Sequence, residues 1–179
     1  LQGTVAAQLL TIKSAQAADP VPAVVINELM WMGTYSGGAN HTADEWIELR
    51  NTTGASIDLS GWQLTHAASS NGTLTIPAGN SIEANGYFLI SNYSETATNS
   101  ILNVAPDWVT TSISLVDDCE AGTAVYMQLQ NPFPTDPPTV IDSAGCGSLA
   151  GSPLAGSNTP AIKKAMERNI LITDGLLVT

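Results

Sequence analysis

Hydrophobic and polar residues alternate with a period of two along most of this chain, which is the pattern of half-buried β-strands. The clearest example lies at the start of the stretch 44–65. Ile47 and Leu49 point to one side of the first predicted strand, whereas Trp46 and Glu48 point to the other side and are expected to face outward. The pattern predicts a strand with one buried and one exposed face.

A second strand follows at once, because Asn51 to Gly54 has the composition of a turn. The alternation then slips by one residue at Gly61, where a β-bulge or a sharp bend would return the later positions to the buried side. The six apolar residues that we expect to be buried together are Ile47, Leu49, Ile57, Leu59, Trp62 and Leu64.

Further strands are predicted along the rest of the chain, separated by turn residues and without any internal repeat. The turn Asn85-Gly86 is the strongest hairpin signal, and residues 33–42 read as a long loop. Within 108–116, Val109, Ile113 and Leu115 are expected to point inward. The predicted strands are Val24–Trp31, Tyr87–Ile90, Trp108–Val116, Ala124–Gln130 and Thr139–Ala144. This arrangement favours an all-β sandwich.

The segments IELRNTTGASIDLSGWQL and LTIPAGNSIEANGYFLI, preceded by VVINELMW, resemble the lamin tail domain family. The resemblance covers roughly residues 24–168 and implies an immunoglobulin-like β-sandwich that binds or spaces and performs no chemistry. It is closer to the bacterial and archaeal extracellular members than to the nuclear ones. The residues that carry the family pattern are Glu28, Trp46, Ile47, Glu48, Leu49, Asn51, Leu59, Gly61, Trp62, Gly79 and Gly86.

The resemblance sets the expected domain at residues 23–169. Residues 161–168 have the propensity of a short helix, but Ala165 to Arg168 (AMER) resembles a stretch near the end of these domains. The Trp and the TPG segment that follow it in the family are missing here, so 170–179 is expected to be a truncated end of the domain or a linker. Residues 1–22 are interpreted as a signal-peptide remnant, because Ala15 to Ala17 fits an A-x-A cleavage site, or as a linker.

The charge pattern excludes one class of partner. Between residues 14 and 162 there are fourteen Asp and Glu and a single basic residue, Arg50, which gives a net charge of −13. Proteins bind phosphate backbones through Lys and Arg, so nucleic acid and anionic membranes are poor partners. No apolar run is long enough to insert into a membrane as a helix. The low content of charged residues, 12%, is typical of secreted β-proteins and favours an extracellular or cell-surface location.

Cys119 and Cys146 are too few for a disulfide scaffold and lack metal-ligand spacing. If 124–130 and 139–144 pair antiparallel with residue 123 opposite Cys146, the two cysteines come close enough for a disulfide, whose Cα atoms prefer to be ~5.5–6 Å apart. We therefore expect a disulfide in the exported form.

Sequence motifs for catalysis are missing. There is no nucleophile elbow, zinc-protease motif, P-loop or dinucleotide fingerprint, and His41 and His66 lie in predicted loops. Glu28, Glu45 and Glu48 invite comparison with paired catalytic carboxylates, but alternating strands place many carboxylates outward. Glu28 and Glu48 are therefore interpreted as exposed or edge residues, and no enzyme activity and no cofactor are expected.

Two kinds of ligand site remain open. Asp117, Asp118 and Glu120 form the densest acidic cluster and are weak candidates for Ca²⁺, although their spacing differs from that of an EF-hand loop. Exposed tryptophans, with Trp46 as the candidate, could stack on sugars.

The main hypothesis is a structural or adhesive module that contacts a protein or a surface polysaccharide. The alternatives are a carbohydrate- or Ca²⁺-dependent binding module and an accessory domain of a secreted nuclease or phosphatase.

Overall fold

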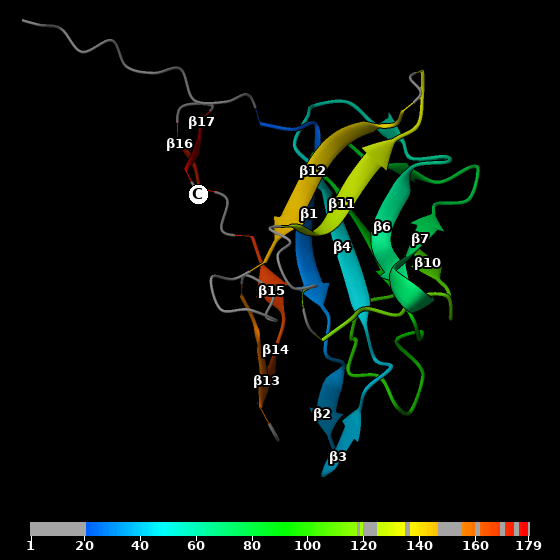
Figure 1. Ribbon diagram of the computed structural model, residues 1–179, viewed down its shortest axis with the longest axis vertical. Helices are drawn as coiled ribbons and strands as arrows, with labels where there is room; N and C mark the ends of the chain where they lie inside the picture. The colour runs from blue at the N-terminus through cyan, green and yellow to red at the C-terminus, as the bar shows by residue number, and fades with distance from the viewer. Residues whose placement is uncertain are drawn as a thin grey trace, which may run out of the picture.

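The computed structural model describes residues 21–117, 119, 125–134, 137–146, 155–159, 162–168, 171–173 and 176–178. Most of the predicted N-terminal remnant therefore lies outside the described residues. Two largely antiparallel sheets pack face to face as an immunoglobulin-like β-sandwich (Figure 1). The first sheet has the order β10 (Trp108–Val109), β9 (Tyr87–Ser91), β4 (Trp46–Asn51), β1 (Val24–Met30), β15 (Met166–Glu167). The second has the order β12 (Thr139–Gly145), β11 (Val125–Asn131), β6 (Gln63–Ala68), β7 (Gly72–Thr75).

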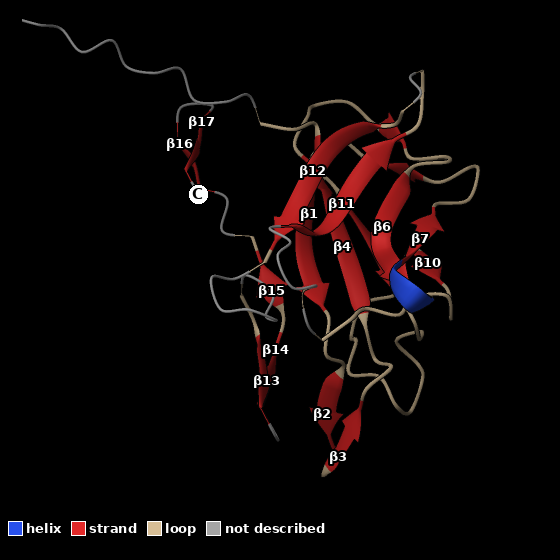
Figure 2. Cartoon of the chain, in the orientation of Figure 1, coloured by secondary structure: helices blue, strands red, loops and turns tan. Residues whose placement is uncertain are grey.

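Short strand pairs and one 3₁₀ turn, η1 (Ser69–Asn71), complete the described chain (Figure 2). The region predicted as a long loop at 33–42 contains a hairpin, because both Gly37 and Gly38 have positive φ and form a two-residue turn. The pairs are β2 (Thr34–Ser36) with β3 (Ala39–His41), β5 (Ile57–Asp58) with β8 (Ser81–Ile82), β13 (Ser157–Thr159) with β14 (Ile162–Lys164), and β16 (Leu171–Thr173) with β17 (Leu176–Val178).

The core forms between the two sheets largely from the apolar face that the alternation predicted. Five of the six residues expected there are buried, and Ile57 is half-buried against them. Gly61 has a φ of 76°, which L side chains rarely adopt, and the turn at this position lets Leu59 and Trp62 both enter the core. The predicted parity slip is therefore confirmed.

A single buried side chain organises the corner after β4. Asn51 is 0% exposed, and its amide donates to the carbonyls of Ala55 and Glu83 at 2.7 and 2.9 Å. The prediction of a hairpin at Asn85-Gly86 is wrong: β8 pairs with β5, and β9 pairs with β4. Of this pair only Asn85 has positive φ, so the turn passes the chain from one strand pair to the next instead of closing a hairpin.

Three smaller expectations also fail. Only Trp108 and Val109 of the strand predicted at 108–116 form one, β10, which pairs parallel with β9, and Val109 is 46% exposed because it lies at the sheet edge. Over the described part of 161–168, residues 162–168, the possible helix does not form, because these residues supply the strands β14 and β15. Along β11 and β12, Val125 lies opposite Gly145, one residue from the expected register, and the same offset is already present at Asn131 opposite Thr139, where the strands leave their connecting loop.

Candidate functional site

The two sheets are joined at one edge by Arg168, the residue that follows β15. Its backbone N–H donates to the Asn27 carbonyl at 2.7 Å, and its Nε donates to the Ile26 carbonyl at 2.9 Å. Its Nη2 lies 2.6 Å from Oδ2 of Asp142 in β12, and that oxygen also accepts the Ile26 N–H at 2.7 Å. We call Arg168, Asp142 and Ile26 the latch, because they tie β15 and β1 of one sheet to β12 of the other.

Local sequence explains the geometry of the latch. The register between β1 and β4 shifts between Ile26 and Glu28, so Asn27 is an extra residue of β1, and its carbonyl accepts the Arg168 backbone N–H. Burial raises the pKa of Asp142, and its hydrogen bond from Ile26 and the charge of Arg168 oppose that rise. The latch therefore holds a largely buried ion pair, in which the Asp142 carboxylate accepts hydrogen bonds from both Arg168 and the Ile26 N–H.

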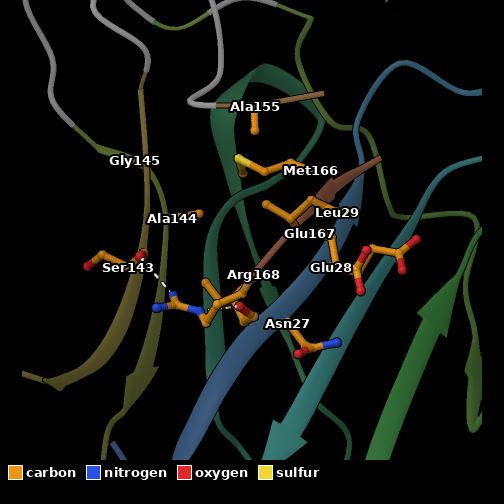
Figure 3. Close-up of a pocket in the computed structure, with 11 residues that line it drawn as sticks. Asn27, Glu28, Leu29, Ser143, Ala144, Gly145, Ala155, Met166, Glu167 and Arg168 are labelled. Atoms are coloured by element: carbon orange, nitrogen blue, oxygen red, sulfur yellow. Dashed lines mark hydrogen bonds between the residues drawn. The ribbon is translucent and has the colours of Figure 1, made fainter. Parts of the chain in front are cut away.

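A groove opens beside the latch, between β1, β15 and β12 (Figure 3). Leu29, which is fully buried, Ala144 and Met166 provide its apolar lining, and Ala155 closes one side. Arg168 reaches across the groove toward the carbonyl oxygen of Ser143, at 3.4 Å. The groove is open because small residues stand where larger side chains would fill the space between the sheets.

Three glutamates lie in a row across the first sheet, next to this groove. Glu28 lies directly opposite Glu48 on one side and Glu167 on the other. Burial raises the pKa of Glu48, and the nearby charges of Glu28 and Glu167 raise it further, while a hydrogen bond from Asn27 lowers it. Like charges placed opposite one another repel, so this row favours an incoming positive charge.

The interpretation of Glu28 and Glu48 as exposed or edge residues is wrong. Both are half-buried on inner strands of the sheet, and both accept hydrogen bonds. Trp46, expected to be exposed, is only 8% exposed, and its indole N–H donates to Glu28 at 2.8 Å. Alternation predicts the face on which a side chain lies, but not what packs against that face.

Two further carboxylates, Asp44 and Glu45, are buried just before β4. Asp44 accepts hydrogen bonds from the Thr34 hydroxyl at 2.6 Å and the Ile101 N–H at 3.0 Å. Glu45 accepts the Leu115 N–H at 3.1 Å, and burial raises its pKa to about 7. Buried acids with raised pKa values often mark active sites, but these two hold the backbone of loops in place.

Of the acidic residues predicted as weak Ca²⁺ ligands, the structure describes one. Asp117 is exposed and accepts a hydrogen bond from Asn158, while Asp118 and Glu120 lie outside the described residues. Within the described residues, no group of three His, Cys, Asp or Glu side chains is placed to hold a metal ion. Cys119 and Cys146 form a disulfide with a Cα separation of 6.0 Å.

The four tryptophans offer little surface to a sugar. Trp31, Trp46 and Trp62 are buried, and Trp108 is half-buried against the core. No helix among the described residues is long and apolar enough to cross a membrane.

The sequence matches the family model of the lamin tail domain over residues 17–131, which is well over half of the chain. A comparison with curated proteins gives no match. The matched region includes β1, β4 and the Asn51 corner, whereas Asp142 and Arg168 of the latch lie beyond it.

Proposed function

Because this chain belongs to the lamin tail domain family, we propose that it is a non-catalytic interaction module of an exported or cell-surface protein, of the bacterial or archaeal extracellular type. The observation that carries the proposal is that the buried carboxylates of this chain bind its own backbone. The buried carboxylates of Asp44, Glu45 and Asp142 each accept backbone N–H groups, so they are committed to holding the sandwich together.

The extracellular location is supported by the disulfide between Cys119 and Cys146, since disulfides persist mainly in oxidising compartments. The low density of basic residues supports partners other than nucleic acid and anionic membrane. The partner in this proposal is a protein of the cell surface, bound without a cofactor. The burial of three tryptophans argues against the alternative of a sugar-stacking platform.

The proposal is tested with the immobilised full chain and two fractions from the surface of the source cells, one of protein and one of polysaccharide. We expect saturable binding to the protein fraction, unchanged by EDTA, and no turnover of phosphodiester, phosphomonoester, glycosidic or ester substrates. Turnover of any substrate, or binding only to polysaccharide or only with Ca²⁺, would contradict it. A gel shift with duplex or single-stranded DNA that weakens as salt rises would contradict the charge argument.

A further inference from the structure

The side chains of Arg50 and Arg168 are used in opposite ways. Arg168 pairs with Asp142 and donates to the carbonyl oxygens of Ile26 and Ser143, so its guanidinium is committed to the fold. Arg50 has a buried Nε without a hydrogen-bond partner, which no other side chain among the described residues shows. Buried polar groups in folded proteins are normally hydrogen-bonded, so an arginine left unpaired by the fold points to a use in binding.

Arg50 lies on the outer face of the first sheet, beside an exposed aromatic ring. Its neighbour in β4, Leu49, points into the core, so Arg50 points to the opposite face. Its guanidinium carbon lies 5.6 Å from the centre of the Tyr87 ring in β9, and Tyr87 is 51% exposed. A guanidinium that stacks on a ring keeps N–H groups at its edge for a carboxylate, which can accept two of them side by side.

Negative charge lies on the same face, a short distance along β4. Glu48 is two residues from Arg50, and alternate residues of a strand are about 7 Å apart on one face. Glu28 lies opposite Glu48 in the neighbouring strand β1. Among the described residues Arg50 has no ion-pair partner, because the one ion pair joins Arg168 to Asp142. The outer face therefore presents one positive group and, about 7 Å away, two negative groups.

This arrangement of charges selects the partner. A carboxylate that binds Arg50 is repelled by Glu48 unless a basic side chain accompanies it. In a strand of the partner, residues two apart point to one face at the same spacing of about 7 Å, so an acid over Arg50 can place a base over Glu48 and Glu28. The net charge of −13 over residues 14–162 also disfavours a partner segment that carries acids alone.

We propose that Arg50, Tyr87, Glu48 and Glu28 form a binding site for an exposed strand of a partner protein that carries an acidic and a basic side chain two residues apart. The inference rests on the proposed function, because it names the surface through which the module binds its protein partner. Arg50 binds the partner's carboxylate, Tyr87 supports the guanidinium and adds apolar contact area, and the two glutamates bind the partner's basic group. Arg and Tyr are the residue types that often dominate binding at protein interfaces.

The test observes the Nε–H signal of Arg50 in the ¹⁵N-labelled full chain. The sequence contains two arginines, so Arg168, whose Nε donates to the Ile26 carbonyl, is an internal control. The probe is a β-hairpin peptide, closed by an Asn-Gly turn, with glutamate and lysine two residues apart on one face. We expect a saturable shift of the Arg50 signal and none of the Arg168 signal. An unmoved Arg50 signal, or equal shifts of both, would overturn the proposal.

Control hairpins test the pattern of charges. One replaces the lysine with glutamate, a second replaces the glutamate with glutamine, and a third moves the lysine next to the glutamate, which places the two on opposite faces. We expect each control to bind at least fivefold more weakly than the probe. Equal binding of the third hairpin would refute the match in spacing, and equal binding of either of the others would refute the match in charge.

Variants of the chain separate the contributions of the two side chains. Arg50→Met should weaken hairpin binding at least fivefold, and Arg50→Lys at least twofold, because an ammonium lacks the planar fork of donors. Tyr87→Phe keeps the ring and should change little, whereas Tyr87→Thr should weaken binding about threefold. Lys164→Met, which removes an equal charge from an exposed position in β14, should leave it unchanged. Amide dispersion checks that each variant is folded, and unchanged binding by a folded Arg50→Met variant would refute the site.

The two proposals can fail separately. If Arg50→Met binds the surface protein fraction as well as the unaltered chain does, the module has a partner but uses another surface. If the unaltered chain does not bind that fraction at all, the proposed function itself is wrong, whatever the hairpin peptide does.

Discussion

Removing Arg168 should destabilise the sandwich, because its side chain makes the latch. The substitution Arg168→Met keeps much of the apolar stem but leaves the Asp142 carboxylate, which is 8% exposed, without its counter-charge. Breaking a buried pair in this way costs about 3–5 kcal/mol, and an exposed pair contributes about 0–1 kcal/mol. Because the Arg168 side chain is 22% exposed, we expect a loss of about 2–3 kcal/mol in the free energy of unfolding.

The measurement is urea unfolding at pH 7, followed by tryptophan fluorescence. The matched control is Lys164→Met, which removes an equal charge from an exposed position in β14 and should change stability by less than about 0.5 kcal/mol. The double variant Asp142→Asn with Arg168→Met should be more stable than Arg168→Met alone, because no uncompensated charge remains. Lowering the pH should also reduce the difference in stability between Arg168→Met and the unaltered chain, because the Asp142 carboxylate becomes neutral. A deficit below 0.5 kcal/mol, or no recovery in the double variant, would refute the role of the latch.

Three other outcomes test the fold. Leu49→Ala, at a fully buried position in β4, should cost ~2–5 kcal/mol, and an unchanged denaturation midpoint would remove its place in the core. The pKa of Glu45 is raised from 4.5 to about 7 in the folded state, so unfolding free energy should fall by about 3 kcal/mol as pH rises from 4.5 to above 7. Glu45→Gln should abolish this pH-dependent fall in the free energy of unfolding. An equally steep fall in that variant would show that another group causes it. No free thiol should titrate from Cys119 and Cys146 in denaturant, and reduction should cost about 3.5 kcal/mol for their 27-residue separation. Two free thiols in the exported protein would contradict this expectation.

The sequence predicts the parts of the fold that depend on neighbouring residues. Alternation identifies the core face of β4, and Gly61 marks the bend, because both signals act within a few positions of the chain. The closeness of Cys119 and Cys146 follows from pairing two neighbouring strands, and a register error of one residue does not separate them.

Long-range packing is what the sequence leaves undetermined. The bond from Arg168 to Ile26 spans 142 positions, and nothing local to either residue indicates it. Trp46 packs within the core and donates to Glu28 in a neighbouring strand, and alternation along its own strand indicates neither contact. The AMER stretch pointed to the end of the domain, but not to an arginine that joins two sheets.

The groove could not be predicted for a related reason. It exists because β12 and β15, from different sheets, leave space beside Ala144 that no single strand pattern describes. Its acidic neighbours, Glu28 and Glu167, meet only when β15 pairs with β1. A groove of this kind is a property of the assembled sandwich.

Hydrogen–deuterium exchange of the full chain, free and bound to the surface protein fraction, tests the central claim most directly. If the folded sandwich is an interaction module for a surface protein, amide protection should increase over one contiguous surface of the described chain and stay unchanged elsewhere. No change in protection in a saturated complex would contradict the claim.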